Sequence, residues 1–227
     1  MQGIVIQGPL DHISKVIDSY LGIPNVVIST WDDESSELIA LIINKGFEVI
    51  TTKKPTIPGY LNINLQLKST NAGLCYLKSL GVTEVLKVRS DLNIDNVPKL
   101  LEVLKGDQLS FLAICKPDVR PLYYNLIYQH TSFDFPTDLI MYGNVDKLIQ
   151  CFGFQLEEEL HIPPEALITY SYFESNEIPF KLDYQTLKDN GMDFFMNRCL
   201  DNNIGIIWEK QGMDLIDYHK NKEHYNY

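Results

Sequence analysis

The segment from Lys87 to Asp91 (KVRSD) brings two basic side chains and one carboxylate together at the end of a strand-like run. A carboxylate just past a central strand can share a divalent cation with two phosphate oxygens, and the cation then offsets charge on a departing diphosphate. Arg89 adds a planar set of donors that fits phosphate. The segment predicts a diphosphate site with Asp91 as metal ligand. The alternative is a structural Arg–Asp pair at the surface.

A second polar turn follows the first apolar run of the chain at Gln7, Gly8 and Pro9. Gly8 permits a close backbone approach, and Pro9 restricts the turn. The turn matches neither the GxGxxG pattern nor a Walker loop, which weakens a dinucleotide or ATP interpretation. We therefore expect either a ligand-binding turn or an ordinary connection between a strand and a helix.

Further polar residues recur where later segments begin or end. Thr30 and Trp31 close a second apolar run, so the indole either borders a nucleobase or packs across the sheet. Asn64, Gln66 and Ser69 supply amides and a hydroxyl that suit hydrogen bonding to sugars and bases. The alternative for this stretch is a helix start with capping side chains.

Three carboxylates are candidates for a base that deprotonates an acceptor hydroxyl: Asp138, the first choice, then Asp134 and Glu165. Each could equally be a helix cap or a turn residue. The five histidines show no ligand spacing, and neither HExxH nor GxSxG is present. Zinc-hydrolase and serine-hydrolase interpretations therefore lack support.

The elements that must position these residues alternate in type. Buried strands are expected at 3–7, 25–29 and 47–50, with helices at 11–20 and 37–44 between them. This order predicts a parallel sheet covered on both faces, with ligands at the carboxyl ends of its strands. The later expected elements are helix 63–80, strand 84–88, helix 96–105, strand 109–114, strand 139–142, helix 144–152, a helix from Pro164, helix 184–200 and strand 204–208.

Length and charge limit the class of protein. The 227 residues suit one domain, 1–227, with a donor-side half at about 1–105 and an acceptor-side half at about 106–227. A formal charge of −11 argues against nucleic acid and against docking on anionic lipid. The four cysteines form no CxxC pair, and neither a signal peptide nor a transmembrane run is recognisable. We expect a cytoplasmic protein, with peripheral membrane association left open.

Several segments in this order resemble the WavE-type lipopolysaccharide-synthesis family over about residues 3–145: 3–9, 27–31, 62–66, 69–74, 87–92, 137–138 and 142–143. The resemblance implies an α/β, GT-A-type nucleotide-sugar-binding fold with a mostly parallel central sheet flanked by helices. It further implies a glycosyltransferase that moves a sugar from a nucleoside-diphosphate sugar to a hydroxyl of a glycan, glycolipid or glycoprotein acceptor.

The resemblance also implies roles for single residues. Those expected around the donor are Gln7, Gly8, Thr30, Trp31, Asn64, Gln66 and Ser69. Arg89 and Asp91, with Ser90 between them, would correspond to the Asp-x-Asp motif that holds Mn²⁺ or Mg²⁺. Arg89 stands where the first Asp would be, so this pair could hold a metal more weakly or partly replace it.

Two other functions fit part of the pattern. A sugar nucleotidyltransferase would need a glycine-rich basic loop after the first strand, and residues 7–11 lack one. A non-catalytic nucleotide- or sugar-binding module of a glycan-assembly complex would keep the binding residues without a catalytic base. The sequence does not distinguish a transferase that inverts the configuration of the anomeric carbon from one that retains it.

Overall fold

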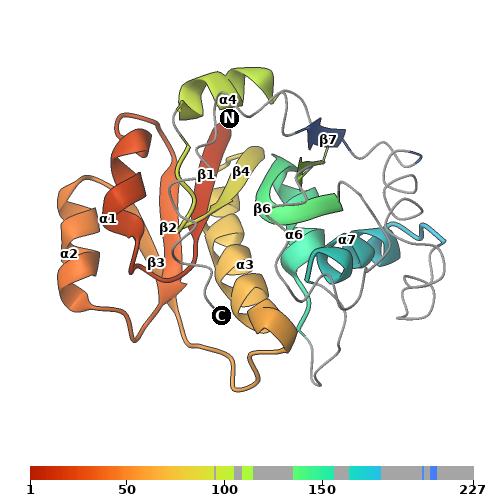
Figure 1. Cartoon of the computed structure of the whole chain (residues 1–227), viewed down its shortest axis with the longest axis horizontal. Coiled ribbons are helices and arrows are strands. Elements are labelled where there is room, and N and C mark those ends of the chain that lie inside the picture. Colours follow the sequence, from red (N-terminus) through yellow and green to blue (C-terminus); the bar gives the residue numbers. More distant parts are fainter. Residues whose placement is uncertain are drawn as a thin grey trace.

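A computed structural model of the chain describes residues 1–94, 96–104, 109–114, 135–155, 164–179, 201 and 205–208. These residues form one mixed sheet with helices on both faces (Figure 1). In chain order the elements are β1 (Gln2–Gln7), α1 (Ile13–Val16), a 3₁₀ turn (Ile17–Tyr20), β2 (Val26–Trp31), α2 (Ser36–Asn44), β3 (Glu48–Thr52), a 3₁₀ turn (Tyr60–Asn62), α3 (Ile63–Ser79), β4 (Glu84–Arg89), α4 (Val97–Val103), β5 (Ser110–Ile114), β6 (Phe135–Asn144), α6 (Val145–Phe152), α7 (Pro164–Ser175) and β7 (Gly205–Trp208).

Most expected elements are confirmed, and two differ in form. The helix expected at 11–20 is a short α-helix followed by the 3₁₀ turn Ile17–Tyr20. There the Ser19 hydroxyl donates to the carbonyl of Val16 at 2.7 Å, which competes with regular α-helical bonding. β6 is longer than the expected strand 139–142, since it begins at Phe135. The helix expected at 184–200 lies outside the described residues.

The seven strands have the order β3-β2-β1-β4-β6-β5-β7. β1, β2, β3 and β4 run parallel, while β6 lies antiparallel between β4 and β5. From β1 the chain builds outward through β2 to β3, and α3 then returns it to β4 on the other side of β1. The order therefore reverses between β1 and β4, and ligands of open α/β sheets bind at the carboxyl ends of strands at such a point.

Two hydrophobic layers enclose the sheet. One layer packs α1, α2 and α4 against residues such as Ile4 and Ile28, and the other packs α3, α6 and α7 against residues such as Val5 and Val27. Consecutive strand residues thus face opposite layers, as the two-residue period of a strand requires. Among the described residues, no helix has the length and apolar character to cross a membrane.

Gly73 sets the distance between α3 and the sheet. A Cβ built there would lie 2.8 Å from Cγ1 of Val5, closer than side chains tolerate, and 3.1 Å from Cβ of Ser29, which is a tight contact. The Ser29 hydroxyl also donates to the carbonyl of Ser69 at 2.6 Å. The polar side chains near the start of α3 are consequently held close to β1 and β2.

Candidate active site at the carboxyl edge of the sheet

The ends of β1 and β4 are joined directly. Gln7 is paired in register with Arg89, and the next backbone N–H, that of Ser90, donates to the carbonyl of Gln7 at 2.8 Å. The Ser90 hydroxyl donates to the carbonyl of Pro9 at 2.7 Å. The two segments highlighted by the sequence therefore form one edge, where the strand order reverses.

Gly8 makes this junction possible. Its φ of +133° lies in a region that side chains rarely adopt, and a Cβ built there would be 2.6 Å from Oγ of Ser90. The group that Gly8 approaches closely is the side chain of Ser90, and its expected role in binding a ligand stays a prediction. Pro9 follows with its side chain exposed.

Arg89 and Asp91 form a two-pronged ion pair. Nε of Arg89 donates to Oδ1 of Asp91 at 2.9 Å, and Nη2 donates to Oδ2 at 2.7 Å. Both side chains are mostly buried, at 23% and 21% exposed. Burial alone would raise the pKa of the Asp91 carboxyl, but the charge and hydrogen bonds of Arg89, helped by Lys87, hold that pKa below its ordinary value.

Lys87 precedes this pair in β4 and is fully buried. Its ammonium is 5.6 Å from the centre of the Phe152 ring, within the range of a cation–π contact. Its charge also acts on Asp91, as the lowered pKa of that carboxyl reflects. The end of β4 therefore holds two cations and one carboxylate inside an otherwise acidic protein.

This donor set does not fit a divalent cation well. Both oxygens of Asp91 already accept hydrogen bonds from Arg89. The described residues contain no cluster of three or more His, Cys, Asp or Glu side chains suited to hold a metal ion. A cation at Asp91 would also meet the charges of Arg89 and Lys87. The Mn²⁺ or Mg²⁺ expected from the sequence stays a prediction that this arrangement does not favour.

Buried polar atoms without partners gather between β1 and α3. Oε1 of Gln7, Oε1 of Gln66 and Oγ1 of Thr70 are buried, and none has a hydrogen-bond partner among the described residues. Buried polar atoms in proteins are nearly always paired, so such a set needs a reason. Gln7 and Gln66 were expected from the sequence. Thr70 belongs to the same polar stretch of the sequence but was not among the residues expected around the donor, although its spacing from Gln66 and Gly73 places all three on one face of α3.

Other residues expected around the donor have partners within the protein. Ser69 contributes its carbonyl to Ser29 and donates its hydroxyl to the carbonyl of Leu65 at 2.9 Å. Trp31 is only 3% exposed, so its indole packs inside the protein. The expectation that it borders a base is not tested, but in this conformation it presents no open ring face.

Thr30 lies on the opposite face of the sheet from Ser29 and Trp31, since neighbouring strand residues alternate. Its hydroxyl donates to Oε1 of Glu34 at 3.2 Å, and the same oxygen accepts the backbone N–H of Leu10 at 3.3 Å. Glu34 thus links the loops after β1 and β2. Sequence inspection missed this carboxylate because its two partners are distant along the chain or lie on another element.

Asn64 organises the loop before α3. Its side-chain amide donates to the carbonyl of Ile57 at 2.9 Å, and its backbone N–H donates to that of Pro58 at 2.9 Å. Just before it, Leu61 and Asn62 have φ values of +51° and +62°. Two consecutive non-glycine residues in the left-handed region store strain, which persists where surrounding structure enforces it. The start of α3 is therefore a constrained part of this edge.

The three candidate bases are described to different extents. The backbone of Asp138 lies in β6, which runs past the carboxyl end of β4, where Val88 pairs with Ile140. Next to β5 the register jumps from Met141 to Thr137, so Asp138 falls in an irregular stretch of the strand. Its side chain, and that of Glu165 in α7, are outside the described part, as is Asp134 entirely.

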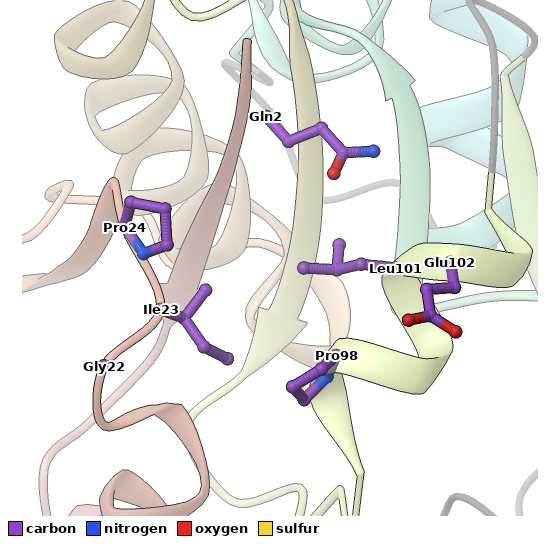
Figure 2. Close-up of a pocket in the computed structure, with 7 residues that line it drawn as sticks. All are labelled: Gln2, Gly22, Ile23, Pro24, Pro98, Leu101 and Glu102. Atoms are coloured by element: carbon purple, nitrogen blue, oxygen red, sulfur yellow. The ribbon is translucent and has the colours of Figure 1, made fainter.

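A pocket of about 470 Å³ lies at the other edge of the sheet (Figure 2). Gln2 begins β1, Ile23 and Pro24 precede β2, and Leu101 belongs to α4, so the pocket opens at the amino ends of the strands. Its lining is mainly apolar, and none of the expected donor-binding residues takes part. It is separate from the candidate site.

Comparison with known proteins identifies the fold. No family model and no curated protein sequence matches the chain. Glucosyl-3-phosphoglycerate synthase from Mycobacterium tuberculosis superposes with a TM-score of 0.51 and 13% identity, over 92% of this chain and 69% of that one. The TarS 1–349 fragment of S. aureus gives 0.49 and 15%, over 96% and 76%. 4-Diphosphocytidyl-2C-methyl-D-erythritol synthase from Anaerococcus prevotii gives 0.48 and 10%, over 92% and 88%.

Of these three likenesses only the one to glucosyl-3-phosphoglycerate synthase has a TM-score above 0.5, and at 13% identity it shows the fold alone. The chain has an α/β fold of the GT-A type, as the resemblance implied, with helices on both faces of a mostly parallel sheet. In this fold, the residues that the sequence singled out at the ends of β1 and β4 meet at one edge. Membership of the WavE-type family stays a prediction.

Proposed function

We propose that this chain is a glycosyltransferase that moves a sugar from a nucleoside-diphosphate sugar to a hydroxyl of an acceptor. One observation above all supports the proposal. At the β1–β4 edge of a GT-A fold, a cationic strand end lies beside buried amide and hydroxyl groups that lack partners within the described residues. Cations suit a diphosphate, and amides and hydroxyls suit a sugar or a nucleobase.

Different residues would bind different parts of the donor. Arg89 would face the diphosphate, since its planar donors match phosphate oxygens. Oε1 of Gln7 and Oε1 of Gln66 are acceptors and require a ligand that donates hydrogen bonds, such as a sugar hydroxyl or a base N–H. Thr70 can donate or accept. The partly exposed Gln66 would be the first of these residues that an entering donor meets.

The proposed reaction breaks one bond and forms one. The bond between the anomeric carbon and the diphosphate oxygen breaks, and its electron pair leaves with the nucleoside diphosphate. The acceptor oxygen bonds to the anomeric carbon and loses its proton. With inversion, a carboxylate takes that proton, and Asp138 remains our choice because its backbone lies beyond the end of β4. With retention, the leaving phosphate oxygen can take it.

A binding and turnover screen tests the proposal. The full chain would be heated with a panel of nucleotides and nucleoside-diphosphate sugars, with and without Mn²⁺ or Mg²⁺. A ligand at a hundred times its Kd raises the free energy of unfolding by about 2.7 kcal/mol, or roughly 5–10 °C in Tm for a chain of this size. Absence of a shift with every nucleotide would contradict the proposal.

Turnover separates the alternatives to a transferase. Release of nucleoside diphosphate from a donor, by transfer or by slow hydrolysis, supports a glycosyltransferase. Tight nucleotide binding with no release from any donor favours a non-catalytic binding module. Release of pyrophosphate from a nucleoside triphosphate and a sugar phosphate favours a nucleotidyltransferase.

The acceptor is a finer part of the proposal. The resemblance to the WavE-type family supports a surface glycan, a glycolipid or a glycoprotein as the acceptor. Oligosaccharides and lipid-linked sugars are therefore the first acceptors to offer once a donor has been found.

A further inference from the structure

We propose that this site neutralises the donor diphosphate with Arg89 and Lys87 in place of a divalent cation, and that Asp91 acts as a positioning residue for Arg89. The inference rests on the proposed function, because it assigns the charges that would face the diphosphate of that donor. It differs from the sequence prediction, in which Asp91 is a metal ligand.

The first support is the geometry of Asp91. Both of its oxygens are used by the guanidinium of Arg89, at 2.9 and 2.7 Å. A metal ligand needs an oxygen lone pair directed at the cation, and a two-pronged pair with arginine occupies the shared edge of the carboxylate. Asp91 instead fixes the plane of the guanidinium, so that Arg89 loses little side-chain entropy when it binds phosphate.

The second support is the local charge. Lys87 and Arg89 both place a positive charge close enough to Asp91 to hold the pKa of its carboxyl below the ordinary value. A divalent cation added at Asp91 would be repelled by both neighbours, whereas a diphosphate would be attracted. The rest of the chain is strongly acidic, so these two cations are not part of a general basic surface.

The third support is the burial of Lys87. Its side chain is inaccessible to solvent, lies against the Phe152 ring and acts on the charge of Asp91. A lysine seldom lies in a sheet core, because removing its charge from water is costly. Charges that are screened little by water act over longer distances. The charge of Lys87 can therefore attract the diphosphate without touching it, while Arg89 contacts it.

Together these residues would perform the electrostatic part of the transfer. As the bond between the anomeric carbon and oxygen breaks, negative charge grows on the diphosphate oxygen that leaves. Arg89 would donate hydrogen bonds to the phosphate oxygens, and the field of Lys87 would stabilise the same charge. The leaving group keeps the electron pair, and no other reactant is required beyond donor and acceptor.

The deciding experiment measures nucleoside-diphosphate binding in the absence of metal. The full chain, freed of metal by a chelating resin and checked by elemental analysis, would be titrated calorimetrically with UDP, GDP, ADP, CDP and dTDP. Each titration would be run in EDTA, in Mn²⁺ and in Mg²⁺. We expect at least one of these nucleotides to bind with a Kd that changes less than about threefold between the three conditions.

Variants assign the effect to residues. We expect Arg89→Gln to weaken binding by about 10- to 100-fold, the usual range for a charge-assisted contact. Lys87→Met keeps the length of the chain and removes the charge, and should weaken binding less than Arg89→Gln does. Lys78→Met is the matched control, since Lys78 pairs with Asp146 at the exposed end of α3 and should leave the Kd within twofold. Thermal unfolding checks that each variant folds.

Asp91→Asn distinguishes the positioning role from metal binding. Replacing a positioning residue leaves Arg89 charged. In EDTA we therefore expect Asp91→Asn to weaken nucleotide binding by less than tenfold, and by less than Arg89→Gln does. Binding that appears only with Mn²⁺ or Mg²⁺ and disappears in Asp91→Asn would overturn this inference while leaving the glycosyltransferase proposal intact. If no nucleotide binds in EDTA, in Mn²⁺ or in Mg²⁺, both this inference and the glycosyltransferase proposal are overturned.

Discussion

The two edges of the sheet treat their polar groups differently. At the amino edge, Tyr142 accepts a hydrogen bond from Gln2 at 3.0 Å and donates one to Glu84 at 3.1 Å. The α-amino group of Met1 donates to Thr83. At the carboxyl edge, Gln7, Gln66 and Thr70 bury polar atoms that have no partner in the described part of the chain. The first edge is arranged for stability, and the second retains hydrogen-bonding capacity that a ligand can use.

The glycine under α3 should produce the largest effect. Gly73→Leu would place side-chain atoms where Val5 and Ser29 already lie, and α3 would have to move away from the sheet. We expect a loss of about 3 kcal/mol in the free energy of unfolding together with loss of nucleotide binding. Chemical denaturation measures the loss. Lys68→Leu, at an exposed position of the same helix, is the control, and an equal loss there would refute the packing argument.

The Arg89–Asp91 pair should give the next largest effect, and its size depends on pH. Because the pKa of Asp91 is held below its ordinary value, the pair stabilises the folded state above that ordinary value and loses its contribution as the pH falls through the folded pKa. We expect Asp91→Asn to cost about 1–2 kcal/mol at pH 7.

The cost should shrink as the pH falls below the ordinary pKa of an aspartate, since the unfolded chain takes up its proton there before the folded protein does. Denaturation of both proteins between pH 2.5 and 8 measures it. A difference that does not change across this range would show that the charge of Asp91 contributes no stability.

At the amino edge, Tyr142→Phe removes two hydrogen bonds. We expect the free energy of unfolding to fall by about 1 kcal/mol and the Kd for nucleotides to stay unchanged. Burial, then the neighbouring Glu84, raises the pKa of Tyr142 to about 12. A raised tyrosine pKa means that stability is lost once the pH exceeds the ordinary value of 10, where the unfolded chain ionises first. The Phe variant should lose less stability than the wild type between pH 9 and 11.

The smallest effects come from two buried hydroxyls on opposite faces of the sheet. Oγ1 of Thr70 and the hydroxyl of Tyr20 are both buried without a partner among the described residues. Removing such a hydroxyl should stabilise the protein by up to about 1 kcal/mol in Thr70→Val and Tyr20→Phe. Only Thr70→Val should weaken nucleotide binding, since Tyr20 packs in the layer with α1 and α2. Equal nucleotide Kd values for the two variants would show that Thr70 does not contact the nucleotide.

Part of the candidate site could be predicted because it depends on local pattern. The apolar runs before Gln7 and Arg89 marked strand ends, and parallel strands bring their carboxyl ends to one edge. Thr30 and Trp31 could not be placed from the sequence. They are neighbours in β2, yet one faces Glu34 and the other packs on the opposite side, since the facing of a strand is set by its partners.

By itself, then, the sequence determined the alternation of strands and helices, the polar strand ends and the unusual Arg-Ser-Asp motif, all of which arise from periodicity and residue type within short segments. Only the tertiary structure decided that β6 lies antiparallel between β4 and β5, that Gly73 holds α3 close to β1, and that Asp91 is engaged by Arg89. These features depend on contacts between segments distant along the chain or on side-chain geometry, and no local pattern encodes either.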